Sequence, residues 1–249
     1  RDALPICAMA LPYHDTMAGL GGDLFVRKAT VEYEASAQYD DALNVGVRLS
    51  RLGRSSMNLQ CAVFRRDKVL VHGELIYVYA NPATQTSQPI PAALREVLEA
   101  FEAGQAMAQP CTADGAADTA AISALRNSLD AEDKALLTAS MQASGDDSSS
   151  SHVWVQNRLG LCVAAARLGK AKEPATMQLD ALVVTPNLRQ SEVLGVLLTA
   201  ARNGASQRGA HQLHITAPSG LARRLMALGF AQLASASDGQ VHLAMACSA

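Results

Sequence analysis

The chain has 249 residues, of which 49% are hydrophobic, so it is long and apolar enough to form the cores of two ordinary domains. Its formal net charge of −2 and its pI near 6.3 give no overall basic field for nucleic acid, and we expect no nucleic-acid partner. No apolar run reaches the roughly 18 residues of a membrane span and no signal peptide opens the chain, so we expect a cytoplasmic protein without membrane contact.

Residues 25–81 alternate polar and apolar side chains, and this period of two predicts β-strands with two unlike faces. The first strand ends before the polar segment Gln38 to Asp41, which turns the chain. A second strand runs from Val45 to Leu49, and Met57 to Phe64 and Val69 to Tyr79 then form a hairpin across a tight polar turn. The segment therefore predicts one antiparallel sheet.

Three phrases of this region carry a resemblance to a known family: LPYHD, VEYEASAQYDDALNVGVRLSRLGRSS and GELIYVYANPATQTSQPIP. They resemble the 4-hydroxybenzoyl-CoA thioesterase-like acyl-CoA thioesterases over residues 1–102. The resemblance implies a hotdog domain, in which an antiparallel sheet curls round one central helix, and an enzyme that hydrolyses acyl-CoA to free acid and CoA. It also implies a thioester site at a dimer interface, so we expect a homodimer or tetramer. CoA is then part of the substrate, and no separate cofactor is expected.

The beginning of the chain, RDALPICAMALPYHD, resembles the end of the family's central helix. In the family, a first strand and an acidic catalytic residue precede that helix. The resemblance therefore implies a truncated domain, with the catalytic carboxylate upstream of Arg1, and we assign no catalytic residue in this segment. Pro5 departs from a good helix interior, because proline lacks a backbone donor and clashes one turn back.

Acid and base side chains occur as three close pairs in this domain, namely His14 with Asp15, Asp40 with Asp41, and His72 with Glu74. The first pair lies in an expected turn, where a helix cap is favoured over a catalytic pair. The second pair is typical of a solvated turn. The third pair lies two residues apart on one strand and shares a face, which favours a cross-strand polar ladder over a catalytic dyad.

Basic residues cluster around the expected turns, namely Arg51, Arg54, Arg65 and Arg66. CoA carries a 3′-phosphate and a pyrophosphate, and arginine binds such groups with two parallel hydrogen bonds. Arg54, Ser55 and Ser56 match a family phrase that lies close to the CoA path. We therefore predict CoA contacts by Arg51, Arg54, Ser55 and Ser56, with solvated strand ends as the alternative.

Residues 103–118 are rich in Ala, Gly, Gln and Pro without an apolar period, which predicts a linker before a second domain over 119–249. A helix is expected from Asp130, and a polar loop is expected from Gly145 to Ser151. The rest predicts a strand hairpin with its turn near Gln156 to Arg158, followed by alternating strands and helices.

The elements expected after the hairpin are a strand over 177–185, a helix over 191–203, a strand over 212–216, a helix over 219–228 and a hairpin at Asp238 and Gly239. With the phrases LDALVVTPNLRQSEVLGVLL and LARRLMALGF, this order resembles the GNAT N-acyltransferases. The resemblance implies an α+β chain overall, with a mixed α/β second domain. It also implies an acetyl-CoA site at Arg189, Ser191 and Gly195, where helix N-terminal amides hold the pyrophosphate.

This second site departs from the GNAT pattern. Gln190, Glu192 and Leu194 stand where the family has small residues, and Leu225 stands where many members have a proton-donating tyrosine. Large side chains hinder the approach to phosphate, and a carboxylate repels it. We therefore predict a degenerate GNAT-like domain with a structural or regulatory role in preference to a working acyltransferase.

Three functions remain open: an acyl-CoA thioesterase, a non-catalytic protein that binds acyl-CoA or acyl-carrier protein, and an N-acyltransferase acting through the second domain. The five cysteines are scattered, and no third ligand accompanies His211 and His214, so no metal site is predicted. Trp154 and the eight methionines are expected in the core.

Overall fold

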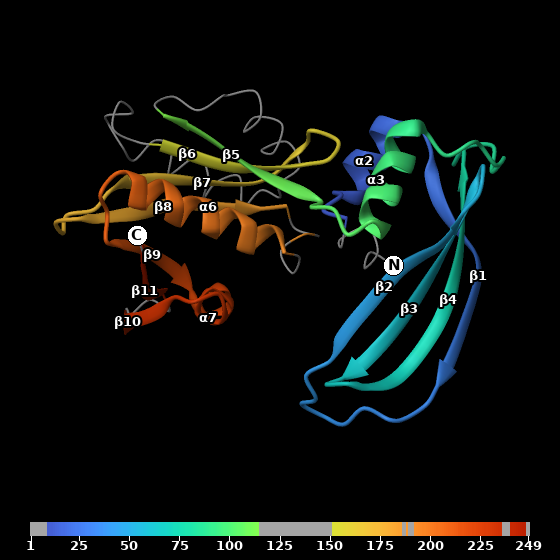
Figure 1. Cartoon of the computed structure of the whole chain (residues 1–249), viewed down its shortest axis with the longest axis horizontal. Helices are drawn as coiled ribbons and strands as arrows, with labels where there is room; N and C mark the ends of the chain where they lie inside the picture. Colours follow the sequence, from blue (N-terminus) through green and yellow to red (C-terminus); the bar gives the residue numbers. More distant parts are fainter. Residues whose placement is uncertain (1–8, 115–150, 186–187, 189–191, 236–239, 248–249) are drawn as a thin grey trace. The chain divides into compact units, whose positions relative to one another are not determined.

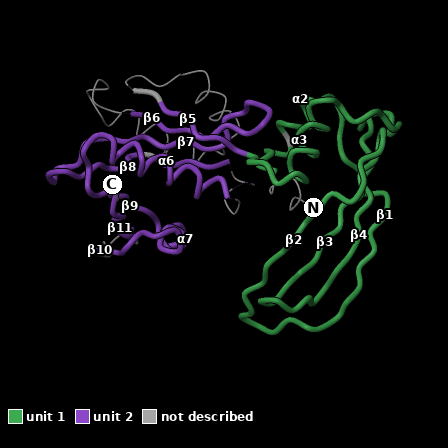
Figure 2. The backbone as a smooth tube through the Cα atoms, in the orientation of Figure 1, with its two compact units in different colours: residues 1–107 green, residues 108–249 purple. Residues whose placement is uncertain are grey.

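The computed structural model describes residues 9–114, 151–185, 188, 192–235 and 240–247. The chain forms two compact units, Arg1–Met107 and Ala108–Ala249 (Figure 2). Each unit combines a β-sheet with helices, so the fold class is α+β. Among the described residues, no helix has the length and apolar character needed to cross a membrane.

Unit 1 contains a sheet of four antiparallel strands, which are long and curved in Figure 1. The strands are β1 (Asp23–Tyr33), β2 (Asn44–Leu52), β3 (Ser56–Arg65) and β4 (Lys68–Ala80), in the order β1-β4-β3-β2. The predicted hairpin is confirmed: Arg65 pairs with Lys68, and Arg66 has the positive φ of 55° that a tight hairpin turn requires.

Two helices accompany this sheet, α2 (Tyr13–Leu20) and α3 (Ala92–Glu102). Helix α2 ends at Gly21, whose φ of 70° is the left-handed conformation that glycine adopts without strain. Helix α3 follows Pro91, which fits a helix start because proline has no N–H to lose there. Neither helix was predicted: we expected a turn at the LPYH phrase and no element over 92–102.

The core of unit 1 lies on one face of the sheet. Met57, Leu59 and Tyr77 are buried there, together with Leu94 and Leu98 of α3. Along β3, the buried Met57 and Leu59 alternate with Asn58 and the exposed Gln60. Because neighbouring strand residues point to opposite faces, the other face of the sheet carries the polar residues.

Unit 2 contains a sheet of seven strands in the order β10-β11-β9-β8-β7-β6-β5. The antiparallel part comprises β5 (Ala108–Asp114), β6 (Ser151–Asn157), β7 (Cys162–Lys170) and β8 (Thr176–Val184). Strand β5 lies inside the segment 103–118 that we expected to be a linker, which corrects that expectation. Strand β5 pairs only with β6, so it is an edge strand. Pro110 is tolerated there, because an edge strand does not need every backbone N–H to pair with a neighbouring strand.

The remaining elements are α6 (Val193–Gln207), β9 (Gln212–Pro218), α7 (Ser219–Ala227), β10 (Ala231–Ser235) and β11 (Gln240–Ala246). Helix α6 connects β8 to β9 and packs on the sheet. Strands β8 and β9 are parallel, and they pair only where Thr176–Leu179 lies beside Gln212–Ile215. Beyond this stretch β8 and β9 do not pair with each other. Strand β11 lies between β9 and β10. The helix expected from Asp130 falls outside the described residues.

A polar pocket on the sheet of unit 1

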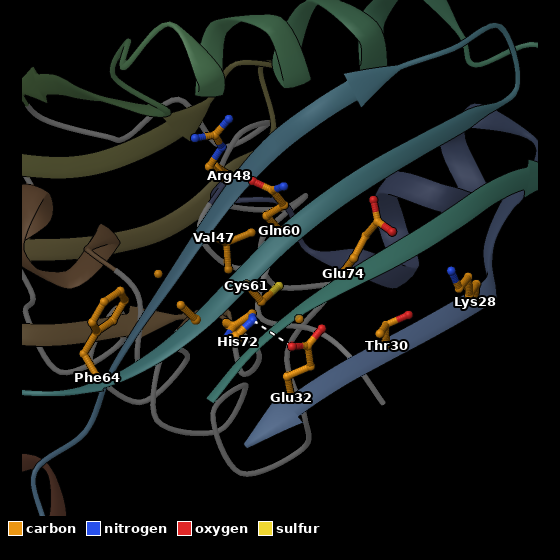
Figure 3. A pocket seen from close by; sticks show the side chains of 13 residues that line it. Lys28, Thr30, Glu32, Val47, Arg48, Gln60, Cys61, Phe64, His72 and Glu74 are labelled. Atoms are coloured by element: carbon orange, nitrogen blue, oxygen red, sulfur yellow. Dashed lines mark ion pairs between the residues drawn. The ribbon is translucent and has the colours of Figure 1, made fainter. Parts of the chain in front are cut away.

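A pocket of about 730 Å³ opens on the polar face of the unit 1 sheet (Figure 3). The polar residues that line it are Lys28, Thr30 and Glu32 of β1, Arg48 of β2, Gln60 of β3, and His72 and Glu74 of β4. All four strands contribute, because the two-residue period places every second side chain on this face. The sequence signal was therefore present in the alternation, although we did not predict that these residues form one site.

Strand register places the lining residues in two rows across the sheet. One row runs from Thr30 through Glu74 and Gln60 to Arg48, and the next from Glu32 through His72 and Ala62 to Gly46. The second row ends in two small residues, and this leaves room above the sheet. The ring of Phe64 borders that space, since a β-carbon added at Gly46 would lie 3.3 Å from it. The pocket is thus hollow where the small residues stand.

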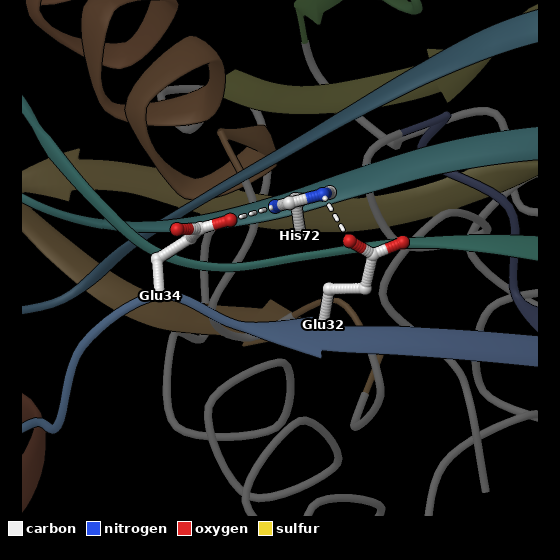
Figure 4. A group of neighbouring side chains, drawn as sticks. All are labelled: Glu32, Glu34 and His72. Atoms are coloured by element: carbon white, nitrogen blue, oxygen red, sulfur yellow. Dashed lines mark ion pairs between the residues drawn. The ribbon is translucent and has the colours of Figure 1, made fainter.

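His72 lies between two carboxylates of β1 and its continuation (Figure 4). Its Nε2 atom is 3.4 Å from Oε2 of Glu32, and its Nδ1 atom is 3.5 Å from Oε1 of Glu34. In the neighbouring row, Nδ2 of Asn58 donates a hydrogen bond of 3.3 Å to Oε1 of Glu74. These contacts confirm the cross-strand polar ladder expected at His72 and Glu74.

The predicted CoA-binding residues of unit 1 lie at another place: Arg51 near the end of β2, Arg54 and Ser55 in the turn that follows, and Ser56 at the start of β3. Arg51 and Arg54 are exposed there, and neither lines the pocket. The turn is held by its own backbone: the carbonyl of Arg54 accepts from Ile90 N–H, and that of Ser55 from Tyr79 N–H, both at 2.8 Å. Ser56 begins β3, and its carbonyl accepts from Gly53 N–H at 2.8 Å.

Arg65 does not join Arg51 and Arg54, because its guanidinium pairs with Asp41 at 2.9 Å. The backbone N–H of Gln38 donates to the same carboxylate at 2.6 Å. This hydrogen bond and the charge of Arg65 hold the pKa of Asp41 below its ordinary value. Asp41 therefore organises the turn before β2. The turn expected at Asp40 and Asp41 is confirmed, but the Asp41 side chain is only 19% exposed, so it is not solvated as expected.

His14 and Asp15 lie inside α2, so the expectation that they form a turn is wrong. Asp15 is exposed in the first helical turn, where the helix dipole favours an acidic residue. No side chain caps this helix, whose N-cap residue is Pro12. The cap interpretation of the pair is therefore also wrong.

In unit 2, Arg189 and Ser191 lie outside the described residues, while Gly195 stands in the first turns of α6. Gly195 lines a second pocket, of about 650 Å³, between α6 and β5. Leu194 is 1% exposed and packs into the core, so it does not project over the start of the helix as we expected. Leu225 is completely buried in α7.

Strand β8 carries a β-bulge next to the point where it leaves β9. Leu168 pairs with Leu179 and Arg167 with Ala181, so Asp180 is the extra residue. Partial burial raises the pKa of the Asp180 carboxyl, and the charge of Arg167 acts in the opposite direction. A β-carbon at Gly169 would overlap this carboxylate, so the glycine makes room for it.

The match to a family model lies within unit 1. Residues 7–72 match the model of the Thioesterase superfamily. A hypothetical protein from Aquifex aeolicus is 24% identical, with a TM-score of 0.32, over 34% of this chain and 66% of that protein. The probable thioesterase YbaW from Escherichia coli is 22% identical, with a TM-score of 0.32, over 34% of this chain and 65% of that protein.

In both cases the matched part spans slightly less than two thirds of the other protein. A gentisyl-coenzyme A thioesterase is 19% identical, with a TM-score of 0.31, over 36% of this chain and 70% of that protein. Among curated proteins, none matches the chain. The family match supports a hotdog-type thioesterase fold for unit 1.

Proposed function

We propose that the protein is an acyl-CoA thioesterase, in which unit 1 binds acyl-CoA and its hydrolysis yields a free acid and CoA. The match of residues 7–72 to the Thioesterase superfamily carries this proposal. In the reaction, water adds to the thioester carbonyl carbon, the carbon–sulfur bond breaks, and the departing thiolate takes up a proton. Such a reaction needs a base to activate the water and donors for the oxyanion.

The turn between β2 and β3 is the proposed binding site for the phosphates of CoA. Arg51 near the end of β2 and Arg54 in the turn are both exposed, so their guanidinium groups reach a ligand without opening the core. Ser55 and Ser56 add hydroxyl groups on a turn whose backbone is fixed by its hydrogen bonds to Tyr79 and Gly53. Such a fixed turn loses little conformational entropy when arginine forks close on phosphate.

The test compares acyl-CoA with the matching acyl-pantetheine, which lacks the nucleotide phosphates. Thiol release is measured for the unchanged protein and for Arg51→Ala and Arg54→Ala. We expect each variant to raise KM for acyl-CoA about 5- to 10-fold at unchanged kcat, because a ground-state contact is lost, and to leave acyl-pantetheine hydrolysis unchanged. Arg66→Ala is the matched control, since Arg66 is an exposed arginine of the other hairpin turn.

Absence of thiol release from every acyl-CoA, with binding retained, would favour the alternative of a non-catalytic protein that binds acyl-CoA or acyl-carrier protein. Equal effects of Arg54→Ala on acyl-CoA and acyl-pantetheine would exclude the phosphate site. Both outcomes are distinct from loss of folding, which circular dichroism detects.

The proposed assembly is a homodimer, or a tetramer built from dimers. Strand β1 supports this proposal, because it pairs only with β4 and its other edge is unpaired within the described sheet. It exposes 46% of Val26, 50% of Val31 and 81% of Tyr33, an apolar edge of the kind that pairs with another chain. Val31→Lys should lower the sedimenting mass to that of a monomer, whereas Leu233→Lys, which changes an exposed leucine of unit 2, should not.

For unit 2 we propose a GNAT-like fold without acyl transfer. The order of its strands supports a relation to that fold: β8 and β9 are parallel and diverge, and β11 lies between β9 and β10. The buried Leu225 supports the absence of transfer, because a leucine cannot protonate a departing thiolate. We expect no incorporation of labelled acetyl groups from acetyl-CoA into amines, and incorporation would make the protein a bifunctional enzyme.

A further inference from the structure

The side chains of Glu32, Glu34 and His72 form a cluster that the proposed hydrolysis does not use. One ligand atom of each lies within 4.8 Å of the others. Sequence spacing did not predict a metal site, because the glutamates come from β1 and its end while the histidine comes from β4. We propose that Glu32 and His72 bind a divalent transition-metal ion and that Glu34 orients the imidazole.

The separation of the two proposed ligands fits a shared ion. Nε2 of His72 lies 3.4 Å from Oε2 of Glu32, which is longer than a good hydrogen bond between nitrogen and oxygen. Zinc binds histidine nitrogen and carboxylate oxygen at about 2.0 to 2.2 Å, and two such bonds at a tetrahedral angle set the ligand atoms about 3.4 Å apart. An ion between the two atoms therefore requires little movement of either side chain.

Glu34 lies on the opposite side of the imidazole ring (Figure 4). Its Oε1 atom is 3.5 Å from Nδ1 of His72. The backbone of Glu34 is held in place, because its N–H donates a hydrogen bond of 2.8 Å to the carbonyl of Leu70. A small movement of this carboxylate would bring it within hydrogen-bond distance of Nδ1. Such a bond would keep the proton on Nδ1 and leave the Nε2 lone pair for a metal, which is the usual arrangement around a metal-binding histidine.

The surroundings allow an ion to enter and remain hydrated. The side chain of Glu32 is 65% exposed and that of His72 is 44% exposed, and both line the 730 Å³ pocket. Coordination positions that the protein leaves open therefore face the pocket and take water. Lys28 and Arg48 also line the pocket and disfavour a cation. Glu74 lines the pocket as well. Together with Glu32 and Glu34 it gives three carboxylates against these two basic groups.

The test is a titration of the metal-free full chain with Co²⁺ and with Zn²⁺ at pH 7.5, followed by calorimetry and by the visible absorption of cobalt. We expect one ion per chain, and a visible absorption spectrum typical of Co²⁺ bound by nitrogen and oxygen atoms. His72→Ala and Glu32→Gln should each weaken binding about 100-fold or more. Glu34→Gln should weaken it about 10-fold, as expected when a residue supports a metal ligand.

Three control variants separate this site from adventitious binding. Glu74→Gln removes a carboxylate on the same face, His242→Ala removes an exposed histidine that bonds to Thr216, and Cys61→Ser removes a thiol at the pocket. The first should weaken binding less than Glu34→Gln, because only a nearby charge is lost, and the other two should bind the ion like the unchanged protein. Binding that survives His72→Ala, or no binding at millimolar metal, would overturn the proposal and leave the cluster as an ion-pair network. Neither outcome depends on thioesterase activity, because the readout is binding.

Discussion

The phenol ring of Tyr79 occupies the space in which a side chain at Gly22 would lie. Its hydroxyl donates a hydrogen bond of 2.8 Å to the carbonyl of Leu20, so the ring joins the end of β4 to the end of α2. Only glycine fits at position 22 without moving this ring.

We therefore expect Gly22→Ala to lower the free energy of unfolding by about 1 to 3 kcal/mol, the usual cost of inserting a methyl group into a packed site. Urea unfolding followed by circular dichroism measures this change. Tryptophan fluorescence is unsuitable, because Trp154, the only tryptophan, lies in unit 2. Gly19→Ala in α2 is the control: nothing lies within 4 Å of its added carbon, so stability should stay equal or rise. Equal losses in both variants would contradict the role of Tyr79.

Glu102 at the end of α3 should stabilise unit 1 more than Glu99 on the same helix. Its Oε2 atom accepts a hydrogen bond of 2.7 Å from Leu49 N–H in β2. Glu99 lies 4.0 Å from Arg95, and its side chain is 61% exposed. We expect Glu102→Ala to cost about 1 kcal/mol and Glu99→Ala about zero, because an exposed ion pair contributes little. Urea unfolding measures both changes in the free energy of unfolding. Equal losses in Glu102→Ala and Glu99→Ala would show that the hydrogen bond to Leu49 adds no stability of its own.

Alkaline conditions should destabilise the protein through Tyr13. Burial, followed by the hydrogen bond to Asp23, raises the pKa of Tyr13 from 10.0 to about 12. Between these two values the unfolded chain loses the phenol proton while the folded protein keeps it, so the free energy of unfolding falls as the pH rises. Unfolding in urea at pH 8, 10 and 11 should show this decrease, and Tyr13→Phe should reduce its slope. A slope that is unchanged in the variant would assign the decrease to other groups.

Cys162 should resist alkylation in the folded protein. Burial raises the pKa of its thiol to about 12, so almost no thiolate is present at pH 8, and the thiolate is the reactive form. Cys61 and Cys111 are half-buried and should be modified first by iodoacetamide. Mass spectrometry of peptides after short exposure measures the order, and the same reaction in urea shows the reactivity of Cys162 once it is unfolded. Modification of native Cys162 as fast as Cys61 would contradict its burial.

The strands of unit 1 could be predicted from the sequence, because the two-residue alternation is a local property. Any chain segment that alternates as 25–81 does has one face to bury and one to expose. Helix α3 also has a local signal, the spacing of Leu94, Val97 and Leu98 on one face of a helix. Strand β5 had no such signal. The proline at 110 suggested a linker, and only the position at the edge of the sheet made a strand acceptable.

The candidate site depended on relationships that no local pattern contains. Whether His72 faces Glu32 is decided by the register of β1 on β4, and a slip of one residue would send one of them to the opposite face. That register includes a bulge between Val26 and Lys28, which the alternation alone does not locate. Leu194 illustrates the same limit, because the sequence placed it at the start of a helix but could not say that it points into the core. Sequence determines which side chains a strand or helix carries, whereas packing of the whole unit determines which of them meet.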